Sequence, residues 1–172
     1  MVIWIIGLSG AGKTTLGQAV CRLWRQSAPN TVLVDGDEIR RIFAMDQLPG
    51  DYSMAARRAN AERMAGICAW LDAQDINVVC CILSMFPDQR AENRARFKAY
   101  YEIFLDAPME LLERRDPKGI YEAARLGHQH NVAGYDLPFP RPEHSDLIVD
   151  MTNAPSPDEL AARILGDLRP AS

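Results

Sequence analysis

Five short apolar runs recur along the chain, and longer, more polar segments separate them. The runs are Val2–Ile6, Thr31–Val34, Ile76–Leu83, Tyr101–Leu105 and Leu147–Val149. Nearly continuous apolar stretches of this length are typical of strands that are buried on both faces, as in a parallel sheet. Their alternation with helical segments predicts an α/β fold, in which a five-stranded parallel sheet carries helices on both faces.

The segments between the runs carry helical spacing or helix-start signals. We expect helices at about 15–26, 53–73, 89–99 and 108–115, and a last helix after Ser156. The start of this last helix combines Ser156 as the N-cap, Pro157 at the first helical position and Glu159 three residues after the N-cap. No repeat or linker divides the 172 residues, so we predict a single domain, 1–172.

The first apolar run leads directly into the pattern G-x-x-x-x-G-K-[ST], which spans Gly7–Thr14. A strand before the pattern and a helix after it are the context that a phosphate-binding loop requires, and they predict a P-loop NTPase fold. Glycines let backbone N–H groups point at a phosphate, and the positive end of the helix lies behind them. Lys13 can reach the β- and γ-phosphates, and the Thr14 hydroxyl can bind Mg²⁺. The predicted ATP contacts are Gly10, Ala11, Gly12, Lys13, Thr14 and Thr15.

Polar residues follow the ends of the predicted strands, where ligands of parallel sheets bind. They are Asp35, Asp37, Ser84 and Asp106. One of the two acids around Gly36 is expected to cap a helix that starts near Glu38. We predict that the catalytic acid is Asp37, which would orient or deprotonate an attacking hydroxyl. Asp106 is expected to cap the helix that follows it.

The segment 116–142 interrupts the alternation, because it is rich in Pro, Gly and His. It is too polar for a core and too long for a tight turn, and in a P-loop kinase a mobile lid would lie there. His128 and His130 lack carboxylate or thiol partners at ligand spacing, so we expect both to be exposed lid residues and not metal ligands.

Composition narrows the class of protein further. The formal net charge of −4 argues against a nucleic-acid-binding surface. The first apolar run is too short for a membrane span or a signal peptide. The four cysteines lack zinc-site spacing, and the adjacent Cys80 and Cys81 should point to opposite faces of a strand. Buried reduced thiols fit a cytoplasmic protein.

Beyond the phosphate loop, the chain resembles the adenylylsulfate (APS) kinases along nearly its whole length. The segments that carry the resemblance are Gly7–Thr15, Val34–Arg40, Arg57 with Asn60, Leu83–Ser84, Arg115–Tyr121, and Gly134 with Asp136. The resemblance implies an ATP-dependent kinase that phosphorylates the ribose 3′-hydroxyl of APS. It implies catalytic roles for Lys13, Asp37 and Lys118, and it implies a homodimer.

The same resemblance implies how the acceptor nucleotide is bound. Arg40 and Arg57 would hold its anionic 5′ group, since an arginine fork suits sulfate or phosphate oxygens, and Asn60 would hydrogen-bond beside them. The implied acceptor-binding set is Asp37, Arg40, Tyr52, Arg57, Asn60, Leu83, Ser84, Lys118, Asn131 and Val132.

The chain departs from the family pattern where the base of the acceptor would lie. Two phenylalanines clamp the adenine in the family, and their counterparts here are Tyr52 and Val132, so one aromatic face is lost. Relatives in capsule phosphoramidate pathways phosphorylate cytidine 5′-diphosphoramidate. This nucleotide is therefore an alternative to APS as the acceptor. A different small-molecule kinase, such as a sugar-acid kinase, is a more distant alternative. A non-catalytic nucleotide-binding switch is the alternative of another class, and the retained Asp37, Arg40 and Lys118 argue against it.

Overall fold

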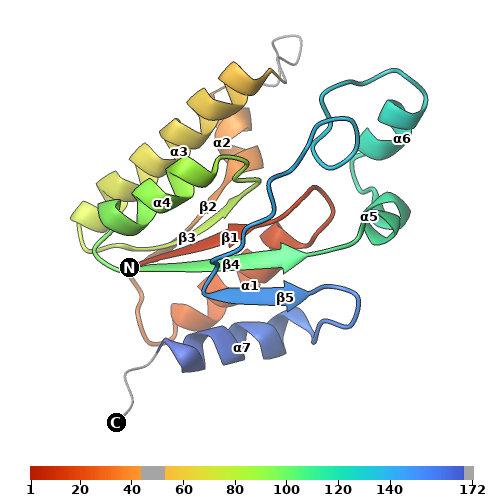
Figure 1. Ribbon diagram of the computed structural model, residues 1–172. Helices are drawn as coiled ribbons and strands as arrows, with labels where there is room; N and C mark the ends of the chain where they lie inside the picture. The colour runs from red at the N-terminus through yellow and green to blue at the C-terminus, as the bar shows by residue number, and fades with distance from the viewer. Residues whose placement is uncertain (44–52, 169–172) are drawn as a thin grey trace.

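A parallel sheet forms the centre of the protein, in a computed structural model that describes residues 1–43 and 53–168 (Figure 1). The strands of the described residues are β1 (Val2–Ile6), β2 (Thr31–Asp35), β3 (Asn77–Ile82), β4 (Tyr100–Asp106) and β5 (Leu147–Asp150). They lie in the order β2-β3-β1-β4-β5, and each neighbouring pair is parallel. The predicted sheet is confirmed, and the strand ends shift by one residue at most.

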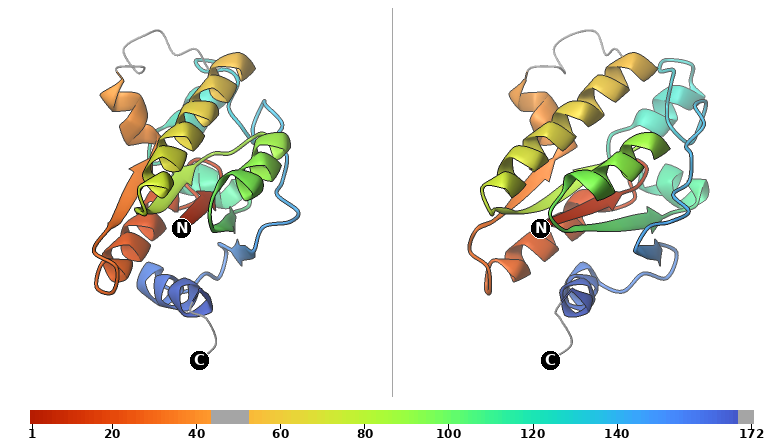
Figure 2. Two further views of the ribbon diagram at one scale, coloured as in Figure 1. Left: turned by 90° about the vertical axis from the view of Figure 1, so that its left-hand side faces the viewer. Right: turned by 60° about the vertical axis from the view of Figure 1, so that its left-hand side comes forward.

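Helices cover both faces of this sheet, as expected. They are α1 (Lys13–Trp24), α2 (Gly36–Ile42), α3 (Met54–Ala73), α4 (Pro87–Arg96), α5 (Met109–Arg115), α6 (Ile120–Arg125) and α7 (Pro157–Asp167). Helices α1 and α7 pack against each other on one face, and α3 and α4 lie on the other (Figures 1 and 2). The capping box that begins α7 is present, with Ser156 and Glu159 each bonded to the backbone of the other.

Alternate residues of the buried strands supply two separate cores, one for each face of the sheet. Ile3 and Cys81 belong to the core beneath α1 and α7, whereas Trp4 and Cys80 belong to the core beneath α3 and α4. The adjacent cysteines therefore face opposite sides, as predicted, and all four cysteines are buried free thiols. Within residues 1–43 and 53–168, no helix combines the length and the apolar character that crossing a membrane needs.

The segment 116–142 differs from the sequence-based expectation, because part of it is helical and part of it is buried. Tyr121 and Val132 are only 2% and 3% exposed, so the expectation that this segment is too polar for a core is wrong for them. Helix α6 begins without a capping side chain at its N-cap residue, Gly119. Instead the Asp116 carboxylate accepts bonds from three backbone N–H groups of its first turn, at 2.9–3.1 Å. His128 is exposed.

Asp106 does not cap the helix that follows it. Helix α5 has Pro108 as its N-cap residue and no side-chain cap bond. The Asp106 carboxylate instead accepts a hydrogen bond from the guanidinium of Arg141. Because Asp106 lies two residues before the N-cap position, its carboxylate is out of register with the free N–H groups of the helix.

Candidate active site

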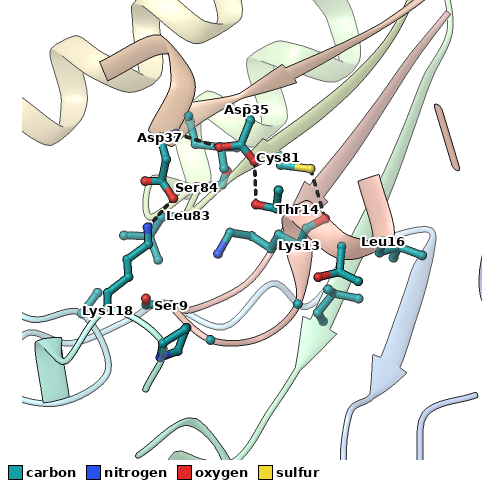
Figure 3. Close-up of a pocket in the computed structure, with 18 of the residues that line it drawn as sticks. Ser9, Lys13, Thr14, Leu16, Asp35, Asp37, Cys81, Leu83, Ser84 and Lys118 are labelled. Atoms are coloured by element: carbon teal, nitrogen blue, oxygen red, sulfur yellow. Dashed lines mark hydrogen bonds and ion pairs between the residues drawn. The ribbon is translucent and has the colours of Figure 1, made fainter. Parts of the chain in front are cut away.

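A cavity of about 950 Å³ opens at the carboxyl ends of β1, β2 and β3 (Figure 3). The chain order in the sheet reverses around β1, and the phosphate loop follows that strand directly. Such a switch point is where open α/β sheets bind their ligands. The cavity wall comes from the loop, the starts of α1 and α2, helix α3, the segment after β3 and parts of the segment 116–142.

The backbone of the phosphate loop needs glycine at two positions. Gly10 and Gly12 have φ angles of 78° and 100°, which are left-handed conformations that favour glycine. Gly12 is also the N-cap residue of α1, so the turn delivers Lys13 and Thr14 into the first turn of the helix. Ala11, in contrast, is fully buried in the core, and its N–H donates to the carbonyl of Leu8 at 3.2 Å.

Lys13 extends from the first turn of α1 into the cavity (Figure 3). Its ammonium donates to the carbonyl oxygen of Leu8 at 2.8 Å. Burial lowers the pKa of Lys13 from 10.5 to about 8, although the nearby Cys81 and Asp37 act in the opposite direction. An anion bound in the loop would stabilise the ammonium and raise this pKa again.

We expect the affinity for ATP to fall as pH rises through about 8. Below that pH the free protein already carries the Lys13 ammonium, whereas above it the proton must be taken up on binding. From this pKa, ATP should bind roughly eightfold more weakly at about pH 9 than at about pH 7.5. Calorimetric titration with a non-hydrolysable ATP analogue measures this difference. Lys13→Arg should flatten the pH dependence, because a guanidinium stays protonated, and equal wild-type affinities would contradict the expectation.

Asp35 links the phosphate loop to α2. Its carboxylate accepts a hydrogen bond from the Thr14 hydroxyl at 2.6 Å, and it also accepts one from the N–H of Asp37 at 2.9 Å as the N-cap of α2. The capping role expected for one of the two acids thus belongs to Asp35. Its link to Thr14 was not predicted, because the sequence does not show how close the two side chains lie.

Asp37 lies in the first turn of α2, and its carboxylate contacts two cations. It forms ion pairs with Arg40 of the same helix and with Lys118 of the segment 116–142. Partial burial opposes ionisation of Asp37, but the hydrogen bonds and charges of Lys118 and Arg40 together lower its pKa. Asp37 is therefore a carboxylate at neutral pH, and its ion pair with Lys118 joins the segment 116–142 to α2 (Figure 3).

Helix α3 supplies Arg57 and Asn60 to the cavity wall opposite the phosphate loop. Arg57 donates to the backbone carbonyl of Asn131, which connects α3 with the segment 116–142. The side-chain oxygen of Asn60 is buried, and among the described residues it has no hydrogen-bond partner. A buried acceptor of this kind calls for a donor, which a bound molecule could supply.

Three of the remaining predicted acceptor residues lie in the same wall. Leu83, Ser84 and Val132 line the cavity, and Ser84 has an unusual positive φ of 54°. Asn131 is exposed and is not among the residues that line the cavity, and its backbone carbonyl accepts the hydrogen bond from Arg57. Tyr52 lies outside the described residues.

Several cavity residues on the far side of the phosphate loop were not predicted. Arg115 lines the cavity and donates to the carbonyl of Gly10 at 3.3 Å. Tyr121 is buried behind the loop, outside the cavity lining, and its hydroxyl donates to the carbonyl of Ser9 at 3.0 Å. The segment between β5 and α7 adds Met151, Thr152, Ala154 and Pro155. Arg115 and Tyr121 belong to the R-D-P-K-G-I-Y segment, but the β5–α7 segment carries no pattern that could have indicated its place.

A phosphate loop at the switch point of a parallel sheet, facing an acid and several cations across one cavity, defines the class of P-loop phosphotransferases. Sequence comparison narrows this class. The family model described as adenylylsulphate kinase matches residues 1–150, and the protein belongs to this family. It is therefore a kinase whose acceptor group is a hydroxyl.

Individual relatives agree with this assignment. The chain is 37% identical over 152 residues to the cytidine diphosphoramidate kinase of Campylobacter jejuni, covering 87% of this chain and 85% of that protein. It is 32% identical over 170 residues to the adenylyl-sulfate kinase of Marinobacter nauticus, covering 98% and 83%. The Mycobacterium tuberculosis APS kinase CysC, solved with AMPPNP and APS, matches with a TM-score of 0.84 at 32% identity, covering 96% of this chain and 95% of that one.

Proposed function

We propose that the protein transfers the γ-phosphoryl group of ATP to the ribose 3′-hydroxyl of a nucleotide with a modified 5′ group, and that APS is the first candidate acceptor. The observation that carries the proposal is one cavity with Lys13 on one side and the Asp37–Arg40–Lys118 cluster on the other. Its volume, about 950 Å³, is near the upper end for small-molecule sites, as two adjacent nucleotides require.

On the donor side, the phosphate loop and Lys13 would hold the β- and γ-phosphates of ATP. The cavity continues past Gly10 to Arg115 and to the segment between β5 and α7, which gives the nucleoside of ATP a place away from the acceptor. Lys13 would stabilise the charge that develops on the transferring group.

Mg²⁺ is the proposed cofactor, and the residues present fit it. The Thr14 hydroxyl and an Asp35 carboxylate oxygen lie 2.6 Å apart, and both are hard oxygen donors. Within the described residues no group of three or more His, Cys, Asp or Glu could hold a metal alone. Mg²⁺ commonly takes only one or two protein oxygens, with water and substrate phosphates completing its shell. Thr14 and Asp35 would hold the ion, which would neutralise charge on the β- and γ-phosphates.

On the acceptor side, Asp37 would accept a hydrogen bond from the 3′-hydroxyl and orient its oxygen toward the γ-phosphorus. A carboxylate with a lowered pKa is a weak base, but phosphoryl transfer asks mainly for positioning and charge stabilisation. Arg40 and Lys118 pair with Asp37 in the structure, which supports a role for both cations beside the transferred group.

Cytidine 5′-diphosphoramidate is the second candidate acceptor. Val132 is buried in the cavity wall and offers an aliphatic surface in place of an aromatic face. The 37% identity to a cytidine diphosphoramidate kinase supports the same candidate. The unpartnered oxygen of Asn60 suits a ribose hydroxyl or a base amine, and both acceptors carry these groups.

A coupled ADP-release assay with the two acceptors offered separately tests the proposal. ADP release should depend on at least one of them. A nucleotide-binding switch would hydrolyse ATP at the same rate with either acceptor or with none, and that result would refute the proposed kinase activity.

We expect Val132→Phe to discriminate between the two bases. If adenine lies against this position, a new aromatic face worth about 1–3 kcal/mol should raise kcat/KM for APS by about 5-fold to 150-fold. Val132→Leu is the matched control, because it adds volume without an aromatic face. An unchanged or lower value for APS in Val132→Phe would favour cytidine.

A homodimer and a cytoplasmic location also remain proposals. The dimer rests on the resemblance to APS kinases, and light scattering of the purified protein would test it. The location is supported by the four buried free thiols.

A further inference from the structure

The backbone at Ser84 is held in a conformation that serine rarely adopts. Its φ of 54° lies in the left-handed region, where a side chain crowds the following carbonyl. Ser84 lies between the end of β3 and the start of α4, and it lines the cavity beside Leu83 (Figure 3). Such a conformation persists only where its surroundings fix it, and it is concentrated at functional sites.

Two side chains from outside the cavity wall fix Ser84. The guanidinium of Arg90 donates from Nη1 to the Ser84 carbonyl oxygen at 2.9 Å, in a buried hydrogen bond. The Trp4 indole donates from Nε1 to the Ser84 hydroxyl oxygen at a longer 3.4 Å. Since the indole can only donate, the serine hydroxyl accepts this bond and keeps its own hydrogen for another partner. Both donors lie behind the turn and not among the cavity-lining residues.

Burying the charged guanidinium of Arg90 costs free energy, so packing alone does not explain an arginine at this position. It is only 9% exposed on α4, and burial lowers the pKa of its guanidinium. The charge of Glu102 acts against this effect. Glu102 is itself 3% exposed and accepts hydrogen bonds from Tyr100 and Ser145, each at 2.8 Å. An apolar side chain would fill the same space without the desolvation cost of a buried charge, so the arginine adds the bond to Ser84 and a countercharge for the buried Glu102.

We propose that Arg90 is a positioning residue of the phosphoryl-transfer reaction, because its hydrogen bond holds Ser84 in the left-handed turn that presents Leu83 and Ser84 to the acceptor nucleotide. This inference rests on the proposed function, which places the acceptor beside Ser84. Trp4 assists by fixing the hydroxyl oxygen. Arg90 touches neither substrate, so its effect should fall on the acceptor and not on ATP.

The test compares Arg90→Met and Arg90→Lys with wild type. Arg90→Met keeps the length of the side chain and removes the donor, and we expect the KM of the acceptor to rise about tenfold, as loss of a hydrogen bond from a charged group implies. The Kd of a non-hydrolysable ATP analogue, measured without acceptor, should stay within about twofold, since donor and acceptor contacts are separate. Arg90→Lys keeps a charged donor and should recover most of the acceptor affinity. If Arg90→Met does not fold, the test rests on Arg90→Lys. An Arg90→Lys protein that folds but differs from wild type in both the KM of the acceptor and the Kd of the ATP analogue would refute the proposal.

Arg96→Met is the matched control. Arg96 belongs to the same helix and makes a surface contact of 3.7 Å with Glu92, so its loss should leave the KM of the acceptor unchanged. Equal effects of Arg90→Met and Arg96→Met, or a parallel loss of acceptor and ATP binding, would show that Arg90 only stabilises α4.

A double-substitution cycle with Ser84→Gly tests the route of the effect. Glycine adopts positive φ without penalty, so the turn no longer depends on Arg90 to offset strain. Arg90→Met should then raise the KM of the acceptor by no more than about twofold in the Ser84→Gly background, a non-additivity typical of coupled residues. The same tenfold rise in both backgrounds would overturn the proposed route. If wild type shows no acceptor-dependent ADP release, the proposed function is refuted, and the role inferred for Arg90 is refuted as well.

Discussion

Lys13→Ala is expected to lower kcat by about 10³-fold or more, because it removes the cation that would face the transferring phosphoryl group in the proposed reaction. The ammonium lies at the first turn of α1, inside the cavity and bonded to the loop carbonyl of Leu8. Lys118 is not placed to replace it without moving, since it is held in an ion pair with Asp37. Steady-state ADP release at saturating substrates measures the effect.

Lys98→Ala is the matched control for this substitution. Lys98 is an exposed lysine that pairs with Asp75 at 2.7 Å, far from the loop in sequence, so its loss should leave kcat unchanged. Thermal unfolding of both variants separates lost chemistry from lost folding. A Lys13→Ala protein that folds and keeps near-wild-type turnover would contradict the assignment of the phosphate loop.

Asp37→Asn is expected to reduce kcat by about 10²–10⁴-fold while the Kd of ATP changes little. The amide keeps the shape of the side chain but removes the negative charge that holds Arg40 and Lys118 and that would orient the acceptor hydroxyl in the proposed reaction. Because these two cations lower the pKa of Asp37, wild-type kcat should show no loss attributable to its protonation as pH falls from about 8 to about 5. Loss would begin only below that range, where the carboxylate takes up a proton.

Glu38→Gln tests whether the effect belongs to Asp37. Glu38 is the next residue of α2, is exposed and pairs with Arg41 at 2.7 Å, so its neutralisation should leave turnover unchanged. Titration of an ATP analogue into each variant provides the second readout. If Asp37→Asn weakened ATP binding and left kcat intact, Asp37 would act in metal binding or in structure instead of at the acceptor hydroxyl.

The features that depend on local sequence could be predicted. Apolar runs such as Val2–Ile6 must be buried wherever they lie, so their number and spacing determine the sheet. The loop that follows β1 is specified by glycines whose positive φ angles few other residues accept, and by Lys13 at a set distance from them. The capping box of Ser156 is likewise complete within four residues.

The features that depend on contacts between distant segments could not be predicted. Arg141 approaches Asp106 from 35 residues away and takes the carboxylate that was expected to cap α5. The bond from Arg90 to the strained Ser84 needs the start of α4 folded back on the end of β3. Val132 lies in a segment rich in polar, Pro and Gly residues, and only the tertiary fold shows that it is buried in the cavity wall.

The position of the new phosphate on the product tests the central claim most directly. After turnover with ATP and the accepted nucleotide, phosphorus-31 NMR coupled to the ribose protons should place a phosphomonoester on the 3′ carbon. The corresponding 3′-deoxy nucleotide should bind without causing ADP release. A phosphate on another atom, or ADP release with the 3′-deoxy nucleotide, would contradict the account of this site as a 3′-kinase.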